Sequence, residues 1–246
     1  MKLLAIDTST EACSVALWLD GEVRERFEIA PRRHTELVLP WADELLAQAG
    51  LAKSQLDAIA VARGPGAFTG VRLAVALAQG MALALDIPVV PVSTLAALAM
   101  QVKFSPSPAL AGEGLGEGAG ILAAIDARMG EIYFGAFRRN ENDVRALGKE
   151  WIATTDDPQL SITGEWQGLG TGFAATEGRL IARLGAALNS CDPSALPHAA
   201  DVARLAVLAF ARGETIAADR LEPAYLRDKV ALTLAEQHKA RGGGRS

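Results

Sequence analysis

The stretch "ARGPGAFTGVRLA", residues 62–74, places three glycines, a proline and a threonine directly before a helical pattern. Glycine adopts backbone angles that other residues avoid, so this spacing predicts a tight turn from a strand into a helix. Such a turn can bind phosphate, carry a nucleophile, or act as a structural joint that sets the angle of the helix. The residues assigned to this loop are Gly64, Pro65, Gly66, Thr69, Gly70 and Arg72.

Two of these uses lack the residues that they need. A Walker A loop requires a Lys-Ser or Lys-Thr pair, and the dinucleotide fingerprint requires a glycine where Thr69 stands. A nucleophile turn requires a serine between two glycines, which this stretch does not contain. Backbone N–H groups at the helix start could still bind an anion. We therefore expect a structural joint, with anion binding as the alternative.

The helix expected at 70–85 carries bulky apolar residues on opposite sides, with two ridges of small residues between them. Such a helix is either enclosed by its own fold or docked on a partner, and both readings stay open. A second helix, expected at 35–49 and ended by Gly50, contains Pro40, so it bends there or begins its regular part there. Together the two helices could form a partner-binding face, made of Leu37, Trp41, Leu45, Val71, Ala74, Val75, Leu77, Ala78, Met81 and Ala82.

The remaining pattern alternates strands and helices in both halves of the chain. In the first half we expect strands at "KLLAID", "CSVALWL", "EVRERFEIA", "LDAIAVA" and "IPVVPV", with a hairpin turn at Asp20-Gly21 and Ser93 capping a helix. In the second half we expect strands at "GILAAID", "EIYFGAF" and within "SITGEWQGLGTG", and helices at 173–190 and 199–212. Both halves open with a strand that ends in an aspartate, Asp7 or Asp126, which indicates a duplicated α/β fold.

Composition shifts suggest four segments along the chain. Residues 1–104 form a first lobe and residues 121–227 a second lobe. Between them, residues 105–120 contain two Ser-Pro pairs and five glycines, which predicts a flexible insertion. Residues 228–246 end in a polar, glycine-rich run and are expected to be a disordered tail.

The composition also limits where the protein works. The net charge of −5 is the wrong sign for gripping a nucleic-acid backbone unaided, so a partner would supply most of such a contact. Apolar runs are interrupted before membrane-spanning length and the start of the chain has no signal-peptide pattern, so we expect a cytoplasmic protein. Cys13 and Cys191 lack metal or redox spacing and are expected to be free thiols.

Candidate catalytic groups are few. His34, His198 and His238 are isolated, and no metal-binding motif occurs, so no metal is expected. Asp7 with the hydroxyls that follow it could orient a metal-bound phosphate, or it could satisfy its own turn. An ATP-dependent phosphotransferase using Asp7 and Asp126 is one alternative function, and a peptidase using Ser9 or Ser93 is another.

Several stretches carry a family resemblance. "LAIDTS" (4–9), "SVAL" (14–17), His34 with "LP" (39–40), "GPGAFTGVR" (64–72), Ser93 with Leu95, and "IDARMGEIY" (125–133) resemble the TsaB (YeaZ) family, with "PAYLR" near the end as a looser match. That family takes part in making threonylcarbamoyladenosine in tRNA. The chain departs from the family pattern at 105–120, where a much shorter connection is expected.

The resemblance implies an actin-like ATPase fold of two RNase H-like lobes, with mixed sheets and flanking helices. It implies that this chain is a catalytically silent relative of the TsaD transferase. The chain would bind TsaD, or a second copy of itself, through the helices at 35–49 and 70–85. A TsaE-like ATPase would join through the complex, and tRNA would be contacted indirectly. Asp7, Ser9 and Asp126 would be a vestigial nucleotide site. The chain would hold no cofactor of its own, with ATP or ADP only at a complex interface.

Overall fold

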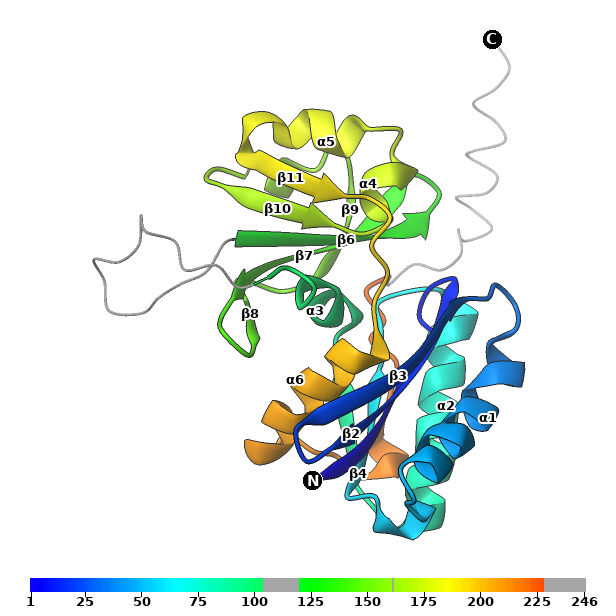
Figure 1. Cartoon of the computed structure of the whole chain (residues 1–246). Helices are drawn as coiled ribbons and strands as arrows, with labels where there is room; N and C mark the ends of the chain where they lie inside the picture. The colour runs from blue at the N-terminus through cyan, green and yellow to red at the C-terminus, as the bar shows by residue number, and fades with distance from the viewer. Residues whose placement is uncertain (104–119, 161, 228–246) are drawn as a thin grey trace, which may run out of the picture.

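The computed structural model describes residues 1–103, 120–160 and 162–227. They form two lobes, each built on one β-sheet, which lie one above the other in Figure 1. The predicted flexible insertion, apart from Gly120, and the predicted disordered tail lie outside the described residues.

The first sheet has the strand order β3-β2-β1-β4-β5. β2 pairs antiparallel with β1 and with β3, whereas β4 pairs parallel with β1 and with β5. Leu19 pairs with Glu22, which confirms the predicted two-residue hairpin turn between them. The five strands are β1 (Lys2–Asp7), β2 (Ala12–Leu19), β3 (Glu22–Ile29), β4 (Ala58–Ala62) and β5 (Val89–Val92).

Three helices of the first half are placed as the sequence predicts, with shifted starts. α1 (His34–Gln48) continues through Pro40 and ends before Gly50, whose φ is +65°. α2 (Phe68–Leu85) follows the glycine loop. α3 (Thr94–Ala99) is capped by the Ser93 hydroxyl, which accepts a hydrogen bond from the Ala96 amide at 3.2 Å.

The second sheet repeats the plan of the first. β6 and β7 pair antiparallel like β1 and β2, and β10 and β11 extend the sheet in parallel like β4 and β5. This repetition confirms the duplicated fold. The strands are β6 (Gly120–Arg128), β7 (Glu131–Arg139), β8 (Val144–Ala146), β9 (Trp151–Thr154), β10 (Trp166–Leu169) and β11 (Leu188–Asp192).

The prediction of one helix at 173–190 is wrong. The segment contains two short helices, α4 (Gly172–Ala175) and α5 (Arg179–Leu184), and then strand β11. Gly178 and Gly185 have positive φ angles of 77° and 53°, so the helix is interrupted at both. β8 and β9 were not predicted because they have only three and four residues. Short 3-10 turns lie at Lys53–Gln55, Pro158–Leu160, Gly185–Ala187 and Ala218–Arg220.

The predicted boundary of the second lobe also needs correction. α6 (Ala199–Ala211) packs on the first sheet, on the face opposite α1 and α2 (Figure 1). The chain then stays with the first lobe, because Ile216 pairs with Val89 and Leu221 joins the same core as α2. The first lobe therefore consists of residues 1–103 and 199–221, and the second lobe lies between them.

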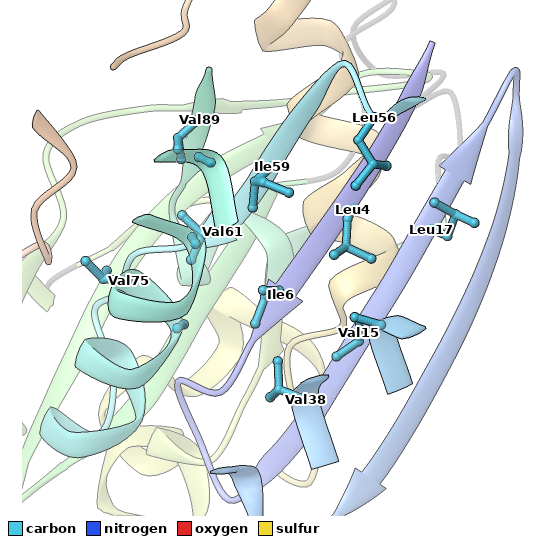
Figure 2. Packing of buried hydrophobic residues seen from close by; sticks show 14 of the residues in the cluster. Leu4, Ile6, Val15, Leu17, Val38, Leu56, Ile59, Val61, Val75 and Val89 are labelled. Carbon is cyan, nitrogen blue, oxygen red and sulfur yellow. The ribbon is translucent and has the colours of Figure 1, made fainter. Parts of the chain in front are cut away.

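The first core lies between the sheet and the two helices α1 and α2. Figure 2 shows Val38 of α1 beside Ile6 and Val15 of the sheet, and Val75 of α2 belongs to the same buried cluster. All residues of β4, "AIAVA", are buried because helices cover both sides of the sheet.

α2 is the one helix of the described residues that is long and apolar enough to cross a membrane by length and composition. No span was predicted from the sequence because polar and glycine positions, Arg72, Gln79 and Gly80, interrupt its apolar run. In the structure α2 lies against β4 and buries Val71, Ala74, Val75, Ala78 and Ala82 in the core of the first lobe. This packing is that of an ordinary helix in a globular lobe.

Candidate functional site

The glycine loop is clamped onto the end of β1. The Ala67 amide donates to the Ser9 carbonyl at 2.7 Å, and the Thr8 hydroxyl donates to the Gly70 carbonyl at 2.6 Å. A Cβ atom at Gly66 or at Gly70 would lie closer than 3.0 Å to the backbone of Ser9 or Thr8. The glycines are thus required for close backbone approach, as expected of a structural joint.

The loop also meets two other parts of the chain. Gly64 has a φ of +107°, and its carbonyl accepts from the Thr94 amide at 3.0 Å. The Arg63 carbonyl accepts from the Ala224 amide at 2.8 Å. Of the residues assigned to the loop, Thr69 and Arg72 are exposed and take no part in the joint. The joint therefore fixes the start of α2 against β1, the start of α3 and the segment around Ala224.

The two strand-ending aspartates close equivalent turns. Asp7 Oδ1 accepts from the Ser9 amide at 2.7 Å and from the Ser9 hydroxyl at 2.6 Å. Asp126 Oδ1 accepts from the Arg128 amide, also at 2.7 Å, and Asp126 pairs with the Arg128 guanidinium. Each aspartate satisfies the backbone two residues ahead, which is an Asx turn.

Asp7 is nevertheless unusual in its electrostatics. The residue is 1% exposed, and its second carboxylate oxygen has no hydrogen-bond partner within the described part of the chain. Burial raises the pKa of Asp7 to about 6, against the lowering effect of the Ser9 hydrogen bonds. A buried carboxylate held in its own turn is poorly placed to orient a phosphate.

The predicted partner-binding residues divide into two groups. Leu45, Val71, Ala74, Val75, Ala78 and Ala82 are at most 5% exposed and belong to the core of the first lobe. They cannot contact a partner unless the lobe opens, which corrects the predicted face. Leu37, Trp41, Leu77 and Met81 are half-buried at its edge, and their role in binding a partner stays a prediction.

The ridge of small residues that was predicted to bind a partner, Ala74, Ala78 and Ala82, is the buried one. Ala76, Gly80 and Ala84 are exposed on α2, and Leu83 beside them is 64% exposed. Phe68 at the start of the helix is 55% exposed and Leu39 of α1 is 45% exposed. We call Leu39, Phe68, Ala76, Gly80, Leu83 and Ala84 the α1–α2 outer face. Only the packing on the sheet distinguishes this ridge from the buried one, because both have helical spacing.

A cavity of about 960 Å³ lies between the lobes. It is lined by the turns after β1 and β6, by the start of α2 and by residues 223–227, which we call the strap. The strap contacts both lobes. Its Tyr225 hydroxyl accepts a hydrogen bond at 2.9 Å from Arg72 of the first lobe. Its Arg227 donates to the Ala127 carbonyl at 3.0 Å and pairs with Glu131, both in the second lobe. Ser9 and Asp126 line the cavity, whereas Asp7 does not.

The hydroxyls considered for a peptidase are engaged elsewhere. Ser9 donates to Asp7 and Ser93 donates to Glu150, and neither hydroxyl bonds a histidine among the described residues. His34 Nε2 lies 3.1 Å from the Thr10 carbonyl and 3.2 Å from the Ala12 carbonyl, and His198 bonds Glu25. Within the described ranges, no group of three His, Cys, Asp or Glu residues could hold a metal ion. His238 lies outside these ranges.

Comparisons with known proteins agree on one group of relatives. The family model of TsaD, tRNA N6-adenosine threonylcarbamoyltransferase, matches residues 27–219. The tRNA threonylcarbamoyladenosine biosynthesis protein TsaB of Escherichia coli is 42% identical over 94% of this chain and 96% of its own length. The TsaB protein of Haemophilus influenzae is 39% identical over 94% of this chain and 95% of its own length. The structure of YeaZ from Pseudomonas aeruginosa superposes with a TM-score of 0.79 at 42% identity, covering 92% of this chain and 99% of that one.

Proposed function

Because the chain belongs to the TsaB family, we propose that it acts in threonylcarbamoyladenosine biosynthesis in tRNA as a subunit that binds a TsaD-like transferase. The observation that carries the binding role is the α1–α2 outer face. It comprises large exposed apolar side chains on both helices and an exposed ridge of small residues on α2, where a partner helix could approach the backbone closely.

The energy of such docking comes from burying apolar surface. Leu83, Phe68 and Leu39 are 64%, 55% and 45% exposed in the chain alone. Each Å² of apolar surface removed from water contributes about 25 cal/mol, before the costs of association are subtracted. A stable interface covers about 800 Å² on each partner, so the half-buried Leu37, Trp41, Leu77 and Met81 would have to join it.

We propose that catalysis belongs to the transferase and that this chain supports its active form. Asp7 is buried in its own turn, and Ser9 and Ser93 are bonded to carboxylates, which supports a non-catalytic role. The same geometry fits a catalytic nucleotide site poorly, because Asp7 does not line the cavity. ATP or ADP would then bind only at an interface with a partner.

The remaining partners follow from the same proposal. Without the transferase, the outer face would pair with a second copy of the chain. A TsaE-like ATPase would join through the assembled complex. The protein would work in the cytoplasm, where tRNA is modified.

Co-purification with the TsaD-like transferase of the same organism tests the proposal. Ala76→Glu or Gly80→Glu places a charge on the outer face, where a Cβ at Gly80 meets nothing within 4 Å. Either variant should keep its fold, lose the transferase, and fail to restore tRNA modification in a mixed assay. Ile181→Glu, which removes a 39% exposed apolar residue from the second lobe, is the matched control and should bind normally. Retention of the transferase by both α2 variants would move the docking site elsewhere.

A further inference from the structure

We propose that the cavity between the lobes holds a single-stranded nucleotide of the tRNA, with its phosphate on Arg32 and Arg72 and its base against Tyr225. This inference rests on the proposed function, since it takes tRNA as the substrate of the complex. It goes beyond that function because it gives this chain a direct contact with RNA.

The cavity is positive although the chain is negative overall. Four arginines and two carboxylates line it, whereas the whole chain carries a net charge of −5. The two lining carboxylates are Glu11 and Asp126. Arg128 pairs with Asp126, and Arg227 pairs with Glu131, which lies outside the lining. Arg32 and Arg72 have no carboxylate partner among the described residues. These two guanidinium groups outweigh the remaining lining carboxylate, Glu11, so the cavity favours an anionic ligand.

Arg72 is held ready for such a ligand. Its guanidinium lies 3.5 Å from the centre of the Phe68 ring, and its Nε donates to the Tyr225 hydroxyl at 2.9 Å. These contacts fix the plane of the group and leave both terminal nitrogens without an acceptor in the described structure. A planar, oriented guanidinium matches the geometry of a phosphate.

Arg32 is the second cation. It lies in the turn before α1 with a φ of +70°, a conformation that costs a non-glycine residue energy. Its side chain makes no hydrogen bond or ion pair within the described ranges, yet it lines the cavity. A strained position that presents an unpaired charge to a cavity is typical of a ligand-binding residue.

Aromatic rings favour a nucleotide over an acidic peptide. Phe68 and Tyr225 are each 55% exposed, and Tyr133 also lines the cavity. A carboxylate ligand would use only the arginines, whereas a nucleotide uses both the charge and a ring face. Basic and aromatic side chains at one site are typical of proteins that bind single-stranded nucleic acid. The cavity volume also lies within the range of known ligand pockets.

Fluorescence anisotropy with a labelled anticodon stem-loop tests the inference. The full chain is titrated at low salt, alone and with the transferase. Arg32→Gln and Arg72→Gln should each weaken binding about tenfold, and each should reduce the slope against log salt by about 0.7. Arg24→Gln removes an exposed charge on β3, outside the cavity, and should change affinity less than about twofold.

Two variants at Tyr225 separate stacking from positioning. Tyr225→Leu should weaken binding about tenfold because it removes the ring. Tyr225→Phe keeps the ring and loses only the hydroxyl that bonds Arg72. It should therefore bind more tightly than the leucine variant. Equal loss in both variants would contradict base stacking.

Three results would overturn the inference. The first is no binding of the stem-loop up to about 100 µM, with or without the transferase. The second is an unchanged affinity for the stem-loop in both arginine variants. The third is that a mononucleotide or polyglutamate displaces the labelled stem-loop as well as unlabelled stem-loop does. Co-purification of the transferase by Arg32→Gln is measured in parallel. Arginine-dependent RNA binding without any transferase binding would instead refute the proposed function and leave the cavity assignment standing.

Discussion

Replacing Gly70 by alanine should damage the joint that positions α2. The new Cβ would lie far inside contact distance of the Thr8 carbonyl, which is backbone and cannot rotate away. The helix start must then move from β1. That movement would break the bond from the Thr8 hydroxyl to Gly70 and the bond from the Ala67 amide to Ser9. The loss of these two partly buried bonds at about 1–3 kcal/mol each, less about 1 kcal/mol gained in helix propensity, amounts to about 1–5 kcal/mol of unfolding free energy.

Urea denaturation of the full chain measures this loss, which should lower the midpoint by roughly 1 M. Gly80→Ala is the matched control on the same helix, because its Cβ meets open space. It should raise the unfolding free energy by about 1 kcal/mol. The same control weakens co-purification if a partner helix packs at Gly80. A Gly70→Ala protein as stable as the parent would refute the role of the loop as a joint.

Two further predictions concern buried positions. Asp7 has a folded pKa of about 6, above its unfolded value of 3.8, so its contribution to stability is present below pH 3.8 and is lost as the pH rises through 6. Asp7→Asn lacks this titration, so its unfolding free energy relative to the parent should rise by about 2–2.5 kcal/mol between pH 4 and pH 7; a constant difference in urea melts would contradict the shift. Ala78→Glu buries an unpaired charge at a residue that is 0% exposed and should cost at least about 3 kcal/mol in the same assay, whereas Ala76→Glu should cost little.

The strand pattern was predictable wherever burial and turn chemistry agreed. Asp20-Gly21 fixed a two-residue hairpin, Gly50 ended α1, and Ser93 capped α3, because each acts through its own backbone or its nearest neighbours. The repeated strand-Asp openings also indicated two lobes of the same plan.

Features that depend on distant packing were not predictable. Nothing in residues 199–211 says which lobe they cover, since an apolar helix fits either sheet. The two small-residue ridges of α2 have the same spacing, so only the position of β4 decides which one is buried. The cavity brings together Arg32, Arg72 and Tyr225 from three separate segments of the chain. The bond between Arg72 and Tyr225 depends on the folded strap.

The return of α6 to the first sheet affects synthesis on the ribosome. Leu3, Ala5 and Ala16 emerge early, but the helix that shields them is made more than 180 residues later. At about 5–20 residues per second, that apolar sheet face stays uncovered for roughly 10–40 s. The nascent protein therefore exposes an apolar sheet face until α6 (Ala199–Ala211) has left the ribosome.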